Sequence, residues 1–247
     1  MDHTNNSCCC GEAEHFSGCL ICGASITYRA ESSIQTCSIC HKEQLTNAVC
    51  ENSHFICDAC HSYGTYAPVI AALRDSTEKD ALLLLEKIMD LPSVHMHGPE
   101  HHVMVGAALL TAYKNAGGAI NLRESVMEML NRGKAVPGGT CGFWGACGAG
   151  ISAGMFVSIL SGATPLTEES WGLSNQMTSK ALEAISRTGG PRCCKRDSYL
   201  AILAAVDFVK THFGIEMECT EVQCTHYAQN NQCIGKRCPF WRFDDSI

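Results

Sequence analysis

Apolar residues recur at helical spacing over most of the chain after residue 65. Runs such as ALLLLEKIM and SYLAILAAVDFV place apolar side chains three and four positions apart, which is typical of helices that bury one face. No segment after residue 65 alternates apolar and polar residues as a half-buried strand would. We therefore predict an all-α body of about six or seven helices. The predicted helical segments cover residues 67–76, 77–92, 99–118, 121–133, 151–162, 167–190 and 198–214.

Helix-start signals accompany three of these segments. Thr77, Asn121 and Thr167 stand where an N-cap side chain would accept a hydrogen bond from the first turn. Pro99 stands near the start of a fourth segment, where its missing N–H costs nothing.

Residues 135–167 carry no charged side chain. Their most apolar part, GISAGMFVSILSGA, is shorter than the roughly 20 apolar residues that a membrane-spanning helix needs. We predict a buried central helix here and no association with a membrane. The Gly150–Gly154 spacing favours close helix packing, either in the core or between copies in a homo-oligomer.

The chain has 247 residues, 18 cysteines and a formal net charge of −7. The acidity disfavours binding to nucleic acid through general electrostatics. The N-terminal MDHTNNSCCCGEAEHF has no basic segment followed by an apolar one, so it does not predict a secretory signal. Without export, so many thiols indicate metal or redox chemistry in a reducing compartment, and we expect a cytoplasmic protein.

The cysteines divide the chain into three parts. Ten lie in residues 1–61, none in 62–140 and eight in 141–238. The first part has too few apolar residues to build a core, so we expect a bound metal to hold it together. The prediction is a Cys/His-rich zinc module over residues 1–64, an all-α domain over 65–215 and a cysteine-containing tail over 216–247.

The N-terminal module contains two CxxC knuckles, each of which places two thiolates on one side of a tight turn. A later run, CENSHFICDAC, adds three thiols and an imidazole and resembles the central run of RING-type and B-box zinc modules. The later CxxC of RING modules is missing, so no ubiquitin-ligase activity is carried over. We predict a zinc-ribbon or RING-like fold with two structural zinc ions, and rubredoxin-like iron is the alternative at the first knuckles. The predicted ligands are Cys19, Cys22, Cys37, Cys40, Cys50, His54, Cys57 and Cys60.

The pairing of these ligands stays open at this stage. Two sequential groups are the simplest arrangement, and a crossed one would join Cys19 and Cys22 to Cys50 and His54. The consecutive Cys8, Cys9 and Cys10 allow three interpretations: spare thiols, an arm that hands over metal or sulfur, or a disordered tail.

Residues 95–102 read His-Met-His-Gly-Pro-Glu-His-His. Imidazoles transfer protons near neutral pH and also bind metals. We predict a catalytic role for this segment rather than a plain histidine-rich surface. The candidates are His95, His97, Glu100 and His101, and we expect at most one of the adjacent His101 and His102 to face a site.

Cysteines far apart in sequence mark a second candidate centre. Cys141 and Cys147 lie in a Gly-rich loop, and Cys193 and Cys194 lie in the turn PRCCKR. Thiols at loop–helix junctions can converge on an iron–sulfur cluster. We predict a [4Fe–4S] cluster on Cys141, Cys193 and Cys194, with Cys147 as fourth ligand or alternate, and we expect Lys195 and Arg196 to bind a carboxylate.

Residues 93–210 resemble iron–sulfur L-serine dehydratases and the related cysteine desulfidases. TCGFWGACGAGISAGMFVSILSGATP is similar to their cluster-binding segment, PRCCKRDSYLAILAAVDF to a later one, and VHMHGPEHHVMVGAALL to their substrate-site motif. The resemblance implies that Cys141 and Cys194 are cluster ligands and that His97 lies at the substrate site. It also implies a lyase in which an iron without a protein thiolate binds the substrate. The family's third ligand has no counterpart here, so Cys193 or Cys147 would replace it.

Several stretches also resemble an uncharacterised cysteine-rich family of anaerobic prokaryotes, domain of unknown function 5714. These are HMHGPEHHVMVGAALLTAYKNAGG, VPGGTCGFWGACGAG, GGPRCCKR and NNQCIGKRCPF. In the last one, Cys233 and Cys238, together with Cys224, could hold a second cluster or a zinc ion, or one of them could complete the first cluster.

The favoured function is a [4Fe–4S]-dependent lyase acting on a small hydroxy or thiol acid. The alternatives are an iron–sulfur redox or sulfur-trafficking protein, which would need a protein partner, and a zinc-stabilised binding module.

Overall fold

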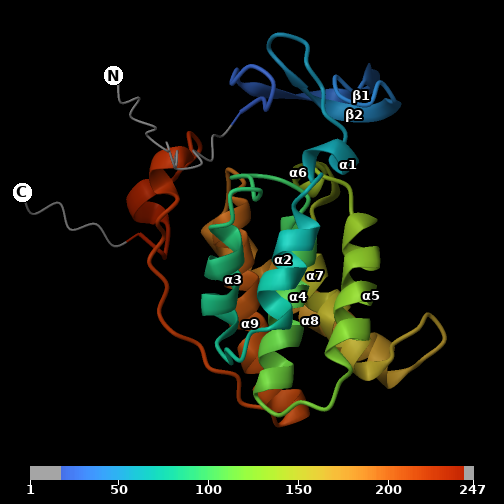
Figure 1. The fold of residues 1–247 in the computed structure, drawn as a ribbon, viewed down its shortest axis with the longest axis vertical. Helices are drawn as coiled ribbons and strands as arrows, with labels where there is room; N and C mark the ends of the chain where they lie inside the picture. The colour runs from blue at the N-terminus through green and yellow to red at the C-terminus, as the bar shows by residue number, and fades with distance from the viewer. Residues whose placement is uncertain (1–17, 242–247) are drawn as a thin grey trace, which may run out of the picture.

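The computed structural model describes residues 18–241, and within them the protein is mainly helical, as predicted. Seven helices have nine residues or more, and a two-stranded sheet precedes them (Figure 1). The strands are β1 (Ile26–Thr36) and β2 (Glu43–Cys50). The α-helices are α1 (Asp58–His61), α2 (Tyr66–Arg74), α3 (Ala81–Met89), α4 (His101–Asn115), α5 (Leu122–Lys134), α6 (Cys141–Trp144), α7 (Gly148–Ser161), α8 (Glu169–Thr188) and α9 (Cys194–Phe213), and the short 3₁₀ turns are η1 (Tyr227–Gln229) and η2 (Gly235–Arg237).

The N-terminal module lies at one end of the helical bundle (Figure 1). β1 and β2 form an antiparallel hairpin in which Ile26 pairs with Cys50 and Thr36 with Glu43. Most side chains of β1 are exposed, the buried cluster around Cys37 also contains Phe55 and Cys57, and few other apolar side chains of the described part of the module are buried. So small a core cannot hold a hairpin on its own. The division into three domains at residues 64 and 215 remains a prediction.

Helix α4 is the centre of the bundle, and nearly every side chain from Val103 to Tyr113 is buried. It packs against α3, α5, α7 and α9. Helix α7 is the apolar helix expected within residues 135–167, and Gly150 and Gly154 let it lie against Leu182 and Thr178 of α8. The Gly150–Gly154 spacing therefore allows α7 and α8 to pack closely in the core. Within residues 18–241, no helix combines the length and apolarity that crossing a bilayer requires.

The helix starts confirm one predicted cap and correct two. Asn121 caps α5 by accepting a hydrogen bond from the Glu124 amide. Helix α3 begins after Asp80 rather than Thr77, since the Asp80 carboxylate accepts bonds from two first-turn amides. Thr167 bonds to Thr164 instead, and α8 begins after Glu168.

The chain beyond α9 returns along the bundle toward the N-terminal module (Figure 1, red). It passes beside α3, where the buried Asp80 carboxylate accepts a hydrogen bond of 2.6 Å from the Thr220 amide. Asp80 therefore caps a helix and anchors this returning segment.

Replacing Asp80 with alanine should lower the free energy of unfolding by about 2–3 kcal/mol, because it removes a helix cap and a charge-assisted bond inside the protein. Urea denaturation followed by circular dichroism would measure the change. Asp75→Ala, at an exposed carboxylate paired with Arg74, is the matched control and should leave the midpoint unchanged. Equal midpoints for the two variants would contradict the anchoring role.

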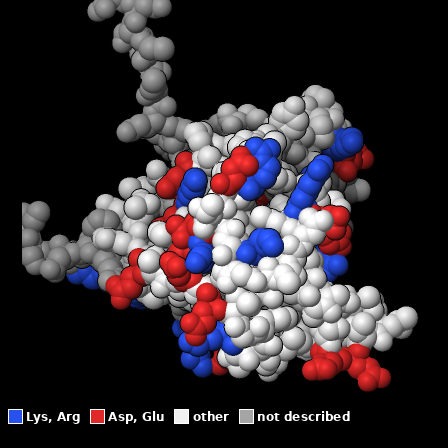
Figure 2. Space-filling model, turned by 60° about the horizontal axis from the view of Figure 1, so that its bottom comes forward, with Lys and Arg blue, Asp and Glu red and all other residues white. Residues whose placement is uncertain are grey.

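Charge is mixed over the face shown in Figure 2. Lysine and arginine side chains there alternate with aspartate and glutamate, and apolar or neutral side chains separate them. This face presents no continuous basic stripe of the kind that follows a nucleic-acid backbone.

Candidate metal centres and the cavity they border

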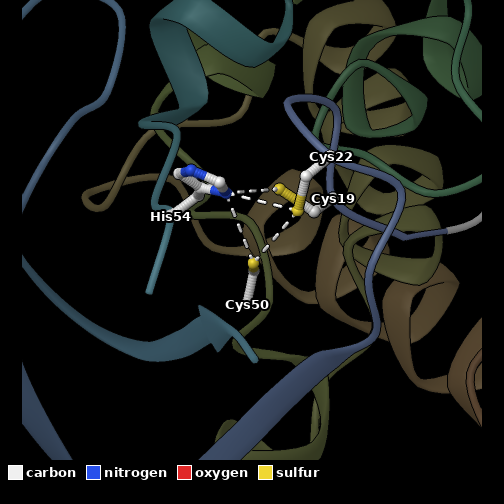
Figure 3. Close-up of side chains that lie close together, drawn as sticks. All are labelled: Cys19, Cys22, Cys50 and His54. Atoms are coloured by element: carbon white, nitrogen blue, oxygen red, sulfur yellow. Dashed lines mark hydrogen bonds between the residues drawn. The ribbon is translucent and has the colours of Figure 1, made fainter. Parts of the chain in front are cut away.

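Cys19, Cys22, Cys50 and His54 form the first candidate metal group (Figure 3). His54 Nδ1 lies 3.3 Å from Cys22 Sγ and 3.6 Å from Cys50 Sγ, and these two sulfurs are 3.7 Å apart. Three thiols and one imidazole at this spacing can surround a tetrahedral ion such as zinc.

Cys37, Cys40, Cys57 and Cys60 form the second group. Cys40 Sγ lies 3.7 Å from Cys57 Sγ, and the Cys57 amide donates to Cys37 Sγ. Backbone amides lower the pKa of Cys37 to about 6 against the opposing effect of burial. An amide also lowers the pKa of Cys22, in the first group, to about 6. The ligand atoms of each group lie within 4.8 Å of one another, so both groups can hold a metal ion such as zinc.

The ligands are paired in the crossed arrangement and not in the simpler sequential one. The hairpin is the physical cause: it returns Cys50 to the start of β1, beside Cys19 and Cys22, and leaves Cys37 and Cys40 at its turn. The chain after β2 then brings Cys57 and Cys60 to that turn. Cys8, Cys9 and Cys10 lie outside the described residues.

A cavity of about 190 Å³ lies between the module and the helical bundle. Contacts between the two parts border it: the Asp58 carboxylate accepts a hydrogen bond of 2.8 Å from the Gly138 amide, and the Arg192 guanidinium lies 4.9 Å from the Tyr28 ring centre. A cavity of this size has room for a molecule as large as benzene. Both halves of the chain line it, including His61, His95, His97 and Arg192.

Glu100 is the centre of the histidine segment, with a fully buried side chain. Its Oε2 lies 3.4 Å from His61 Nδ1, and its Oε1 lies 3.5 Å from His95 Nδ1. Although burial opposes ionisation, these two imidazoles hold the pKa of Glu100 well below its ordinary value. Sequence reasoning missed His61. The available signal was its position directly after the metal ligand Cys60.

His97 lines the cavity and bonds to the C-terminal segment. Its Nε2 lies 3.2 Å from the Asn230 Oδ1, an acceptor, so Nε2 carries the proton. Nδ1 is then a bare acceptor, and it is buried with no hydrogen-bond partner in the structure. Burial and the nearby Arg192 charge lower the pKa of His97 to about 4, which keeps the ring neutral at pH 7.

His101 occupies a different environment from the one predicted. It is fully buried, its Nδ1 bonds to the Gly98 carbonyl, and it is not among the residues that line the cavities. The neighbouring His102 lines a second, smaller cavity that also contains Cys141, Cys147 and Cys194. Its Nδ1 bonds to the Val136 carbonyl.

Cys141, Cys147 and Cys194 line a smaller cavity that shares Gly98 and Arg192 with the first one. Each thiol stands at a helix start: Cys141 begins α6, Cys147 is the N-cap of α7 and Cys194 begins α9. Helix N-termini favour negative charge, and their free amides can donate to bound sulfur. Burial raises the pKa of Cys194 to about 11.

Cys193 does not line this cavity, and its place in the predicted ligand set stays a prediction. It is the N-cap of α9, with extended backbone, and its sulfur accepts the Arg196 amide on the other side of the turn. There it lines a third cavity, together with Cys224, Cys233 and Cys238 of the C-terminal segment.

The basic residues of the PRCCKR turn also differ from expectation. Lys195 is fully buried, donates to the Met89 carbonyl and is not among the residues lining the cavities. Arg196 pairs with Asp197 and donates to two carbonyls. Arg192 instead lines both cavities, and its buried Nε has no hydrogen-bond partner in the structure.

A family model described as a family of unknown function, DUF5714, matches residues 69–241. Comparison with curated proteins finds no match, and comparison with solved structures finds none. No relative therefore names a lyase, and the resemblance to serine dehydratases remains a prediction.

Proposed function

Since the chain belongs to the DUF5714 family of unknown function, we propose its activity from its own residues: a [4Fe–4S]-dependent lyase for a small hydroxy or thiol acid. The observation that carries the proposal is the set of three thiols, Cys141, Cys147 and Cys194, on one cavity. Three thiolates leave one iron of a cubane cluster without a protein ligand. Structural zinc in the N-terminal module completes the proposal, and the reducing cytosol is the compartment in which such thiols persist.

The donor set suits a cluster rather than a single ion. The three sulfurs come from three helix starts, and they are not among the groups of described residues that are close enough to bind one ion together. When bound, the cluster would supply a Lewis-acidic iron for the hydroxyl or thiol that leaves the substrate.

Arg192 would bind the substrate carboxylate. Its guanidinium borders both cavities and can form a paired hydrogen bond with a carboxylate. Burial is the largest cause of the low pKa of His97, and the Arg192 charge adds to it; a carboxylate on Arg192 would offset that second contribution, so substrate binding would make the imidazole a stronger base.

His97 Nδ1 would remove the proton from the carbon next to the carboxylate. The electron pair of that C–H bond would form the new C=C bond, and the neighbouring carbon would lose its hydroxyl or thiol group. The proton would then leave with that group as water or hydrogen sulfide. The elimination is redox-neutral, so it needs neither an oxidant nor a reductant.

We expect anaerobically purified protein to be brown, with about four irons and four acid-labile sulfides per filled cluster. It should release water or sulfide from members of a panel of small hydroxy and thiol acids. His97→Gln should slow turnover by roughly 10²–10⁴-fold, the range for loss of a general base. Arg192→Lys should raise KM because it cannot bind a carboxylate in paired fashion. Arg187→Lys, at an exposed pair on α8, is the matched control. Zinc without any sulfide would rule the proposal out.

A redox or sulfur-trafficking protein is the second candidate. The observation that favours it is the third cavity, where Cys193, Cys224, Cys233 and Cys238 provide four thiols. Four thiolates would saturate a cluster and suit electron transfer. An iron content near eight per chain, with a reversible one-electron signal, would support this role beside or instead of the lyase.

A further inference from the structure

We propose a third metal site, in which His61, His95 and Glu100 bind one divalent transition-metal ion. The site is separate from the two zinc groups and from the thiol cavities, and it does not rest on the iron–sulfur proposal. It would be an open site, with coordination positions left for water or a small oxygen ligand.

The ligand atoms of these three residues converge from two parts of the chain. They lie within 4.8 Å of one another, although His61 belongs to the N-terminal module and Glu100 precedes α4 in the helical domain. The rings of His61 and His95 meet edge to face with their centres 4.5 Å apart. This arrangement brings two imidazoles and one carboxylate to a single point.

The converging atoms lack other partners. His61 Nδ1, His95 Nδ1 and Glu100 Oε2 are all buried without a hydrogen bond in the structure. Their polar neighbours are one another, at 3.4 Å for His61 and Glu100 and 3.5 Å for His95 and Glu100, so the three side chains depend on this one point for their partners. A metal ion in their midst would satisfy all three at once.

The surrounding chain holds the three ligands in place. The His95 backbone amide donates to Glu100 Oε1, which orients the carboxylate and leaves Oε2 free. A β-carbon at Gly98 would overlap the Glu100 carboxylate and the His61 ring, so only glycine at this position lets them approach. His61 follows Cys60 directly, so the second zinc group fixes its position.

The ligand chemistry narrows the choice of ion. Two imidazoles and one carboxylate are typical of open zinc and non-haem Fe²⁺ sites, whereas thiolate-rich sites hold structural zinc or clusters. Glu100 is fully buried, while His61 and His95 are 20% and 28% exposed and line the 190 Å³ cavity. The vacant coordination positions would therefore face the cavity, beside His97 and Arg192.

Cobalt(II) is the probe for the test, because it binds the same ligands as zinc and iron and absorbs strongly when a thiolate coordinates it. Zinc-loaded full-length protein would be dialysed against a mild chelator, analysed for metals and titrated with Co²⁺ under anaerobic conditions. We expect one equivalent of metal beyond the two zinc groups, either retained zinc or added Co²⁺ without thiolate absorption.

Four variants define the outcome. His61→Asn and His95→Asn should each lower the affinity of the third site for its metal ion. The loss should exceed the 10–100-fold that is typical when an outer-shell partner is removed. Glu100→Gln should abolish binding at this site, and the two histidine variants keep the test decisive should Glu100→Gln fail to fold. His212→Gln, at an exposed histidine on α9, is the matched control.

Identical metal content and Co²⁺ affinity in the wild type, His61→Asn and His95→Asn would overturn the proposal. Glu100 would then be the partner of a protonated histidine in a plain ion pair. Cys194→Ser separates the two proposals: it should remove the iron–sulfur cluster and leave this equivalent of metal in place.

Discussion

Replacing Cys37 with serine is expected to unfold the N-terminal module while the helical domain stays folded. Cys37 is fully buried, and it is both a ligand of the second metal group and one of three residues in the module's apolar cluster. Structural zinc contributes on the order of 10 kcal/mol to the folding of small zinc modules. Little else in the module could replace that contribution.

The crossed pairing extends the effect to both metal groups. The first group lies at the open end of the hairpin and the second at its turn, and the chain passes from one group to the other between His54 and Cys57, so releasing one group loosens the other. We expect the zinc content to fall by at least one ion per chain and protease cleavage to appear within residues 18–64. The helical circular dichroism should persist, since the bundle has its own core around α4.

Cys219→Ser is the matched control, because Cys219 is an exposed thiol outside the metal groups. It should keep the full zinc content and the wild-type protease pattern. Cys37→Ser protein with unchanged zinc and unchanged protease resistance would mean that the hairpin folds without its metal ions.

Loss of the module would also disable the cavity. His61, Tyr28 and Asp58 all come from the module, and they form one wall of it. Zinc ions bound in the two groups would therefore do more than hold a small domain together. They would position one wall of the cavity where we propose chemistry.

The helical body was predictable because its signal is local. Apolar residues at helical spacing and the Asn121 cap fix helices without knowledge of the partners. The pairing of the metal ligands was not local. The same thiols serve either pairing, and the hairpin that decides between them has mostly exposed strands with no alternating apolar pattern.

Side-chain direction was the second limit of sequence reasoning. Cys193 and Cys194 are adjacent, yet one caps α9 in extended conformation and the other begins the helix, so their sulfurs face different cavities. Spacing alone cannot reveal such a change of direction. The sequence did not predict Arg192 and His61 as lining residues for a related reason: each stands next to a cysteine whose metal-ligand spacing already accounts for the motif.

These adjacent cysteines give the second large prediction. Cys194→Ser should abolish lyase turnover, a loss of more than about 100-fold, because a cluster ligand contributes more than an outer-shell residue. It should also remove about four irons and four sulfides per chain. Cys193→Ser should retain that cluster and the turnover, since its sulfur lines the third cavity instead.

Iron and sulfide analysis, electron paramagnetic resonance and turnover assays on both variants would measure the difference. Each substitution changes a sulfur to an oxygen at the start of the same helix, so general damage to α9 should affect the two alike. The helical circular dichroism of both should match the wild type. Equal loss of iron and activity in the two variants would instead place Cys193 and Cys194 on one cluster. The Cys193 side chain would then have to change direction when the cluster binds. A difference confined to Cys194→Ser would mean that the three-thiol cavity alone holds the reactive iron, with its open position toward Arg192 and His97.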